Sequence, residues 1–223
     1  MKKHSVQIVL FDLDGTLLDT APDLAFALNA VLQEQQREPL AFDVIRPWVS
    51  HGAEALIRYG FNLADTDLQT AFLRQRLVEI YADHIAERSC LFSGMGEVLA
   101  IFKQQGIQWG IVTNKLHYLT VPLLEKLGLA EQSICTISGD TLPQKKPDPA
   151  PLLHACALAK TQPENCIYVG DAQRDIEAGQ RAGMRTFVAL YGYLGVDDQP
   201  DRWGATGMLQ TPLDLLTYLS INV

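Results

Sequence analysis

The stretch that decides the fold is IVLFDLDGT, residues 8–16, in which four consecutive apolar residues run into two carboxylates. Continuous hydrophobicity over so few residues is typical of a strand that is buried on both faces, as in a parallel sheet. Comparable apolar runs occur at 109–112, 134–137, 166–169 and 186–190, with helical patterns between them. This alternation predicts an α/β fold: a doubly wound, Rossmann-like parallel sheet covered by helices.

The segment 20–89 departs from the alternation, because it contains no apolar run of the buried-strand kind. Helical patterns fill it instead, and Pro22 suits the first turn of the first one. A short pattern follows at 42–49, another begins after Gly52, and a long one covers 68–86. We therefore expect an all-helical domain over 20–89, inserted into a core of residues 1–19 and 90–223. An irregular run of crossover helices stays open as the alternative.

Helix ends within the core follow from glycine and proline. Gly106 and Gly128 each come directly after an amphipathic stretch, where a glycine commonly ends a helix. Proline interrupts the hydrogen bonds of a helix interior. We therefore expect Pro122 in the first turn of the helix that ends before Gly128.

The composition of the chain argues against several classes of function. The 223 residues carry 18 Lys and Arg against 26 Asp and Glu, a net charge of −8, which argues against nucleic acid or an anionic membrane as the main partner. No apolar run approaches the roughly 18 residues of a membrane span. The basic flank at Met1–His4 precedes an apolar run too short for a secretory signal. The four cysteines form no C-x-x-C pair, so reduced thiols and a cytoplasmic location are expected.

Polar side chains follow each apolar run. They are Asp12 and Asp14 after the first, Thr113, Asn114 and Lys115 after the second, Lys146 beyond the third, and Asp171 with Asp175 after the fourth. In open α/β sheets ligands bind at this edge, beyond the carboxyl ends of the strands. Several carboxylates in one crevice repel each other unless a cation neutralises them, and Mg²⁺ prefers such oxygen ligands.

A phosphate ester fits both the carboxylates with their cation and the hydrogen-bond donors at this edge of the sheet. Lys146 and Thr113 suit a tetrahedral oxyanion, because an ammonium and a hydroxyl can both donate hydrogen bonds to it. Carboxylates two residues apart, at Asp12 and Asp14, can divide the work: one attacks phosphorus and the other transfers the proton.

These residues resemble the four motifs of the haloacid dehalogenase (HAD) superfamily. FDLDGTL at 11–17 is similar to its D-x-D-G-T motif, VTN at 112–114 to the second motif, Lys146-Pro147 to the third, and Gly170-Asp171 with Asp175 to the fourth. The motifs occur in the family's order and span the chain. The resemblance implies a HAD core, with the helical segment 20–89 as its C1 cap.

The resemblance also implies a role for each matched residue. Asp12 would be the nucleophile that forms an aspartyl-phosphate, and Asp14 the general acid and base. Thr113 and the Asn114 amide would hold phosphoryl oxygens, and Lys146 would neutralise Asp12 and the transferred group. Mg²⁺ would bind the Asp12 carboxylate, the Asp14 carbonyl oxygen and Asp171. Asp175 would hold a metal-bound water or support those ligands.

The segment WVSHGA at 48–53 resembles the substrate-specificity loop of phosphoglycolate phosphatases, and YGYLG at 191–195 resembles a branch that includes N-acetylmuramic acid 6-phosphate phosphatases. The implied reaction is Mg²⁺-dependent hydrolysis of a small, carboxylate-bearing phosphomonoester such as 2-phosphoglycolate. N-acetylmuramic acid 6-phosphate and a β-phosphoglucomutase reaction are the alternatives. We expect a small phosphorylated metabolite as partner, no membrane or nucleic acid, and a monomer or homodimer. The expected substrate-binding residues are Thr16, Asn114, His51, Gly52, Ala53 and Arg58.

Two other classes of protein share part of this pattern. A response-regulator receiver also carries a phosphorylatable aspartate, but it is about half this length and needs neither Asp14 nor an insert. A sugar-phosphate binding module would not need both carboxylates. Among single residues, Asp19 suits a hinge or a helix cap, Asp175 a helix cap, and Lys115 substrate or solvent. Lys145, Arg174 and Arg185 are expected at the surface, and Asp140 in a turn.

Overall fold

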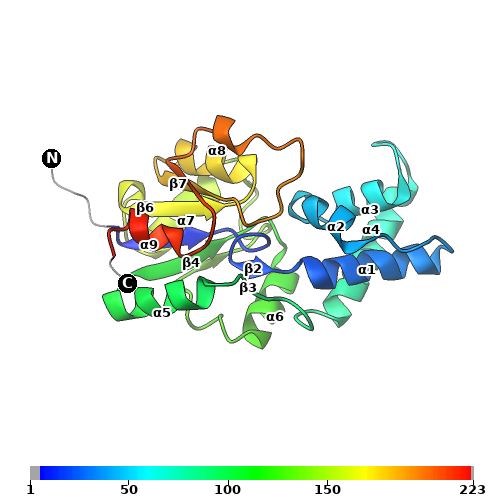
Figure 1. Cartoon of the computed structure of the whole chain (residues 1–223), viewed down its shortest axis with the longest axis horizontal. Helices are drawn as coiled ribbons and strands as arrows, with labels where there is room; N and C mark the ends of the chain where they lie inside the picture. The colour runs from blue at the N-terminus through cyan, green and yellow to red at the C-terminus, as the bar shows by residue number, and fades with distance from the viewer. Residues whose placement is uncertain (1–5, 222–223) are drawn as a thin grey trace.

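A six-stranded parallel sheet lies at the centre of the computed structural model, which describes residues 6–221 (Figure 1). In spatial order its strands are β5 (Thr136–Ile137), β4 (Gln108–Val112), β1 (Ile8–Phe11), β6 (Cys166–Gly170), β7 (Arg185–Ala189) and β8 (Gly207–Leu209). The chain runs outward from β1 to β5, returns to β6 beside β1, and runs outward again to β8. This order is that of a doubly wound sheet, so the predicted fold class is confirmed. The predicted flank at Met1–His4 falls outside the described residues.

Helices cover both faces of the sheet. On one face Val9 and Phe11 of β1 pack with α5 (Met95–Gln105), α6 (His117–Lys126) and α9 (Asp214–Tyr218). On the other, Ile8 and Leu10 pack with α7 (Ala150–Leu158) and α8 (Gln173–Arg181). All four residues of β1 are therefore buried, which is why its sequence is apolar throughout rather than alternating.

The segment between β2 (Leu18–Asp19) and β3 (Cys90–Leu91) is helical and lies beyond one end of the sheet, at the right of Figure 1. It contains α1 (Ala21–Glu34), α2 (Phe42–Ile45), the 3-10 helix η1 (Arg46–His51), α3 (Ala53–Phe61) and α4 (Gln69–Asp83). Pro22 lies in the first turn of α1, as predicted. The strands β2 and β3 pair antiparallel, so the two connections to the helical segment run side by side.

Several sequence predictions need correction. Pro122 lies inside α6 rather than in its first turn, because α6 already begins at His117, where the Asp140 carboxylate accepts the backbone N–H at 2.8 Å. The expected strand 134–137 shortens to Thr136–Ile137. The strands β2, β3 and β8 and the helix α9 were not predicted, since each is five residues or shorter and carries no long apolar run.

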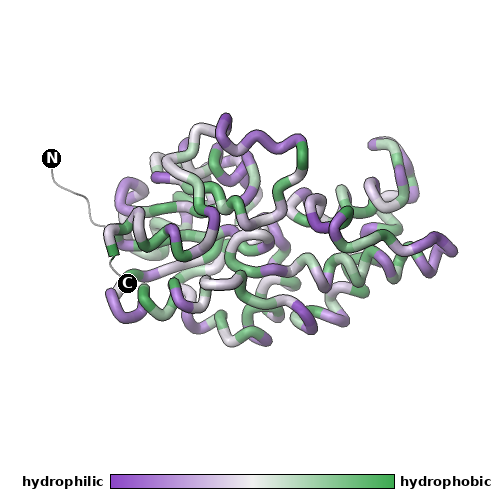
Figure 2. Tube along the Cα trace, in the orientation of Figure 1, coloured by the Kyte–Doolittle hydropathy of each residue, from purple (hydrophilic) through white to green (hydrophobic). Residues whose placement is uncertain are grey.

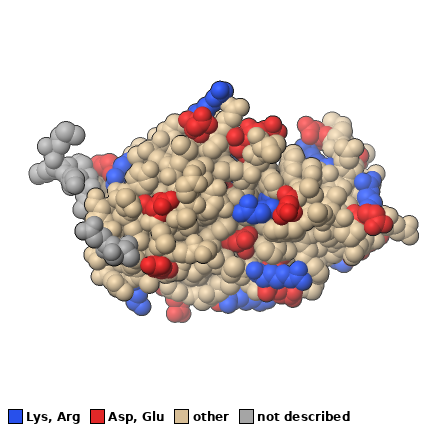
Figure 3. All heavy atoms as spheres, viewed as in Figure 1, with Lys and Arg blue, Asp and Glu red and all other residues tan. Residues whose placement is uncertain are grey.

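Apolar and charged residues separate as the fold requires. In Figure 2 hydrophobic segments run through the sheet, and hydrophilic segments gather in outer loops and helix ends. On the face shown in Figure 3 acidic and basic side chains are interspersed. Within residues 6–221, no helix is both long enough and apolar enough to cross a lipid bilayer.

Two further one-turn helices, η2 (Pro163–Asn165) and η3 (Pro200–Arg202), lie in connections of the core.

Candidate active site

Asp12 and Lys146 form a buried ion pair where β1 ends. The Asp12 Oδ1 atom lies 2.8 Å from Lys146 Nζ and accepts the Leu13 backbone N–H at 2.8 Å. The same ammonium lies 2.7 Å from Asp175 Oδ1 and donates to the Val112 carbonyl oxygen at 3.1 Å. Contacts from several elements therefore hold Lys146 Nζ against Asp12.

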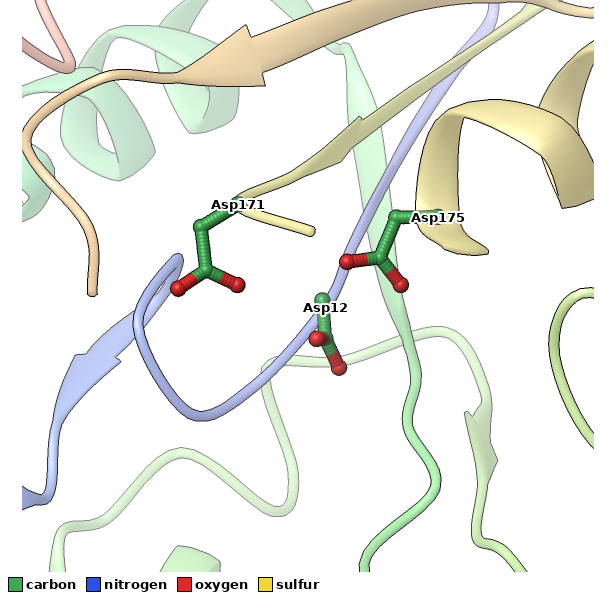
Figure 4. Close-up of side chains that lie close together, drawn as sticks. All are labelled: Asp12, Asp171 and Asp175. Atoms are coloured by element: carbon green, nitrogen blue, oxygen red, sulfur yellow. The ribbon is translucent and has the colours of Figure 1, made fainter. Parts of the chain in front are cut away.

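Three buried aspartates converge beside this pair, as Figure 4 shows. Asp12 follows β1, Asp171 follows β6, and Asp175 lies in the first turn of α8; each offers an oxygen within 4.8 Å of the others. Burial, reinforced by the Asp12 and Asp175 charges, raises the pKa of Asp171 to about 7. Burial also raises the pKa of Asp12. The Asp175 carboxylate additionally accepts the Ala172 backbone N–H at 3.1 Å, so it both caps α8 and contacts Lys146.

The donor set fits a hard divalent cation. Asp171 Oδ1 is buried and has no hydrogen-bond partner among the described residues, whereas Oδ2 accepts the Tyr193 backbone N–H at 2.9 Å. Gly15 lies directly against this carboxylate with φ +84°, and a Cβ at that position would clash with Asp171 Oδ2. An orphaned carboxylate oxygen among buried acids is the arrangement that an oxygen-preferring ion such as Mg²⁺ neutralises.

Asp14 lies across a tight loop from Asp12 and has its own partners. Its carboxylate pairs with Lys115 Nζ at 2.9 Å and accepts the Thr20 hydroxyl at 2.5 Å. The Lys115 ammonium also lies 4.4 Å from the centre of the Tyr81 ring, on α4. Lys115 is therefore largely shielded from bulk solvent, it lines the cavity, and it connects the loop of Asp14 to the helical segment.

Thr113 and Asn114 follow β4 and line a cavity that Asp12 and Asp14 also line. The Asn114 side-chain amide is engaged by the backbone of Lys146, donating to its carbonyl oxygen and accepting its N–H, both at 3.1 Å. This clamp fixes the loop of Lys146 beside β4. The backbone N–H of Asn114 can therefore serve a phosphoryl oxygen without breaking the clamp.

A cavity of about 440 Å³ opens above these groups, between the sheet edge and the helical segment. The predicted residues Asp12, Asp14, Thr113, Asn114, His51, Gly52 and Ala53 all line it. Its walls are largely apolar, formed by Leu24, Val49, Val78, Tyr81, Leu116 and Leu119. Burial, with a further contribution from Arg174, lowers the pKa of His51, which favours its neutral form.

Comparison with known proteins agrees with this geometry. Residues 9–189 match a family model described as haloacid dehalogenase-like hydrolase. The chain belongs to the haloacid dehalogenase-like hydrolase family. It is 37% identical over 219 residues to the N-acetylmuramic acid 6-phosphate phosphatase of Pseudomonas aeruginosa, covering 98% of this chain and 97% of that protein. It is 40% identical over 207 residues to the phosphoglycolate phosphatase of Xanthomonas campestris pv. campestris, covering 93% of each.

A solved structure described as a predicted phosphoglycolate phosphatase from Haemophilus somnus 129pt superposes with a TM-score of 0.83 at 26% identity, covering 96% of this chain and 98% of that one. This HAD hydrolase is therefore an enzyme of the phosphatase type, and the receiver and binding-module alternatives are set aside.

Two expected substrate contacts of the hydrolase lie elsewhere. Thr16 is fully buried beneath the loop, where its carbonyl oxygen accepts the Tyr191 hydroxyl at 3.1 Å, and it is absent from the cavity lining. Arg58 pairs with Glu54 at 2.7 Å and with Asp65 at 2.8 Å, and it is absent from the cavity lining. Only the start of α3 reaches the cavity, and Arg58 lies more than one turn further along.

Sequence reasoning missed four residues that reach the site. Arg174, expected at the surface, lines the cavity and donates to the Ser50 carbonyl oxygen at 2.6 Å. The Ser50 hydroxyl donates to Asp171 Oδ2 at 2.6 Å. Arg74 lines the cavity from α4, and Tyr193 contacts Asp171. The available signals were the proximity of Arg174 to Asp171 and Asp175 along the chain, and the place of Ser50 in WVSHGA and of Tyr193 in YGYLG.

Tyr193 joins the acidic site of the hydrolase to the connection at β2. Its buried hydroxyl donates to Asp19 at 2.7 Å and accepts the backbone N–H groups of Thr20 at 2.6 Å and Ala21 at 2.9 Å. Asp19 also accepts the Ala21 N–H at 3.3 Å, but the cap position of α1 is held by Thr20, so the helix-cap reading of Asp19 is wrong. Through its backbone N–H and its hydroxyl, one residue therefore positions both Asp171 and the start of α1.

Proposed function

We propose that this protein is a Mg²⁺-dependent phosphomonoester hydrolase that works through an aspartyl-phosphate on Asp12. The observation that carries the proposal is the buried Asp12–Lys146 pair at 2.8 Å, with Asp14 nearby on the same loop. A carboxylate fixed against an ammonium is oriented for attack, while the same ammonium can balance the phosphoryl charge. The segment 20–89 is proposed to be the cap that closes over this site.

The proposed steps divide between the two carboxylates. An Asp12 oxygen attacks phosphorus, and the bond from phosphorus to the leaving oxygen breaks. Asp14 gives its proton to that oxygen and then removes a proton from water, which attacks phosphorus and releases inorganic phosphate from Asp12. The Thr113 hydroxyl and the backbone N–H of Asn114 are proposed to hold the phosphoryl oxygens.

Asp12, Asp171 and the carbonyl oxygen of Asp14 are proposed to hold Mg²⁺. The cation would offset the negative charge that gathers on the phosphoryl oxygens. Asp175 would fix Lys146 and hold a water of the metal. These assignments rest on the convergence of the three carboxylates and on the orphaned Asp171 Oδ1.

The substrate is proposed to be a small phosphate that also bears a carboxylate. 2-Phosphoglycolate and N-acetylmuramic acid 6-phosphate share these groups, and relatives named for each cover more than 90% of this chain. The cavity favours the larger molecule, since about 440 Å³ with apolar walls exceeds what a two-carbon acid fills. The apolar walls would contact the sugar ring and its acetyl group.

Two further expectations about the setting of the enzyme stay proposals. Three of the four free cysteines are buried thiols, which supports work in the reducing cytoplasm. A cavity that is closed by residues of one chain supports a functional monomer, with a homodimer as the alternative.

The test is phosphate release with Mg²⁺ and with EDTA. The panel holds 2-phosphoglycolate, N-acetylmuramic acid 6-phosphate, β-glucose 1-phosphate and p-nitrophenyl phosphate. Mg²⁺-dependent release is expected, with the highest kcat/KM on a carboxylate-bearing compound. Conversion of β-glucose 1-phosphate to glucose 6-phosphate would indicate the mutase instead, and no release from any compound would refute the proposal.

A further inference from the structure

The helical segment carries its positive charge on arginine alone, since residues 20–89 contain no lysine. Five of its six arginines have partners. Arg37 donates to the Phe61 carbonyl oxygen, Arg46 to that of Tyr191, Arg58 pairs with Glu54 and Asp65, Arg76 with Glu34 and Glu79, and Arg88 lies over the Phe26 ring. Across residues 6–221, Arg74 makes no hydrogen bond, ion pair or ring contact.

Arg74 also differs from these arginines in its position. It projects from α4 and lines the cavity above Asp12. The acids that line the cavity are already matched: Asp12 by Lys146, Asp14 by Lys115, and Glu54 by Arg58. The guanidinium of Arg74 therefore faces a cavity without a carboxylate left to pair with it.

The core side of the cavity offers two cations without an ion pair among the described residues, Lys145 and Arg174, and Arg174 is held by the Ser50 carbonyl oxygen. Lys145 lines the cavity and makes no ion pair within the described residues, whereas Lys115 is bound to Asp14 and Lys146 to Asp12 and Asp175. In a chain of net charge −8, unmatched cations that face one cavity point to an anionic ligand. The phosphoryl group has Lys146 as its own cation, so the anion left for Arg74 is a second group of the substrate.

We propose that Arg74 is the specificity-determining residue that binds the carboxylate of the substrate, assisted by Lys145 from the core. This inference rests on the proposed phosphatase function. A guanidinium binds a carboxylate through two parallel hydrogen bonds, a geometry that a lysine ammonium cannot reproduce. The phosphoryl group then lies at Asp12 and the carboxylate at α4, so the substrate spans the cavity.

The experiment compares substrates with and without the carboxylate, which is exchanged for a methyl group in one pair and removed with its lactyl ether in the other. N-acetylmuramic acid 6-phosphate is paired with N-acetylglucosamine 6-phosphate, and 2-phosphoglycolate with ethyl phosphate. The variants are Arg74→Gln, Arg74→Lys, Lys145→Gln and, as matched control, Arg76→Gln, whose side chain pairs with Glu34 outside the cavity. Thermal unfolding of each variant checks that the fold is kept.

For Arg74→Gln we expect KM to rise about 10- to 100-fold for the carboxylate-bearing member of each substrate pair, with kcat nearly unchanged. This is the scale expected for the loss of a charge-assisted hydrogen-bonded pair. On the carboxylate-free member KM should change less than about twofold, because no contact is lost. Arg74→Lys should fall between wild type and Arg74→Gln, Lys145→Gln should show a smaller selective rise, and Arg76→Gln should match wild type.

Other outcomes separate the two proposals. If wild type releases phosphate but Arg74→Gln affects both members of a pair equally, or neither, the role of Arg74 is refuted and the phosphatase stands. If wild type releases phosphate from no compound, the proposed function fails and the role of Arg74 fails with it.

Discussion

The two sides of the cavity neutralise their charges in different ways. On the sheet side, Asp12, Lys146 and Asp175 form one buried network in which the lysine ammonium contacts both carboxylates within 2.8 Å. On the helical side, the cavity is lined by apolar residues such as Leu24 and Val78, together with the unpaired guanidinium of Arg74. The sheet side is fixed before a substrate arrives, whereas the helical side is completed by the substrate.

This difference assigns chemistry and selectivity to separate parts of the chain. Preorganised charges lower the barrier because they need not reorient during the reaction. Selectivity depends on contacts that one ligand makes and another lacks. Substitutions on the helical side can change such contacts without disturbing the network at Asp12. Variants on the sheet side should therefore affect every substrate, and variants on the helical side only some.

The largest effect is expected for Asp12→Asn. An amide cannot form the aspartyl-phosphate, so kcat should fall about 10⁴-fold or more on all substrates, as for other covalent nucleophiles. The fold should persist, because the change removes one of three crowded carboxylates. Phosphate release and circular dichroism measure the two effects; full activity of the variant would show that the nucleophile is another residue.

Asp14→Asn should have the next largest effect. Loss of the general acid and base should lower kcat about 10²- to 10⁴-fold. With p-nitrophenyl phosphate, whose leaving group needs little protonation, the loss should fall mainly on hydrolysis of the aspartyl-phosphate. Acid quenching should then trap more phosphoenzyme than in wild type, whereas an unchanged steady-state level would contradict the role of Asp14 in the second step.

A smaller effect is expected on stability in the metal-free protein. The pKa of Asp171 is about 7 in the folded state against 3.8 ordinarily, so between these values the folded state binds more protons than the unfolded state. Stability attributable to Asp171 is therefore present below about pH 4 and is lost as the pH rises to about 7, by a few kcal/mol at most. Mg²⁺, which prefers the ionised acid, should restore it above pH 7.

Chemical denaturation of wild type and Asp171→Asn in EDTA, from pH 4 to 8, measures the contribution of Asp171 to the free energy of unfolding. The difference between their unfolding free energies should change across that window and then level off. Asp83→Asn, which alters an exposed carboxylate on α4, is the control and should run parallel to wild type. A pH-independent difference for Asp171→Asn would show that this carboxylate is ionised throughout.

The same contrast explains which features could be read from the sequence. Buried parallel strands are apolar throughout and end in polar residues, so the strands and Asp12, Asp14, Thr113 and Lys146 could be located from the chain alone. Arg74 could not, because its helical pattern offers two arginines, Arg74 and Arg76, and only packing decides which one faces the cavity. Arg58 is expected there from its place in the helix after Gly52, but it pairs with Glu54 and Asp65 and does not line the cavity.

The smallest effect is expected for Arg58→Ala, and it sharpens the comparison within the helical side itself. Its pairs with Glu54 and Asp65 are partly exposed, so their loss should cost less than about 1 kcal/mol of stability. KM should stay within about twofold of wild type on both members of each substrate pair, since Arg58 does not line the cavity. A selective rise in KM of about tenfold for the carboxylate-bearing member would instead indicate that Arg58 on α3 binds the carboxylate. The two arginines carry the same charge on neighbouring helices, so a difference between their variants would reflect what separates them: Arg74 lines the cavity without an ion pair among the described residues, whereas Arg58 is paired and does not line it.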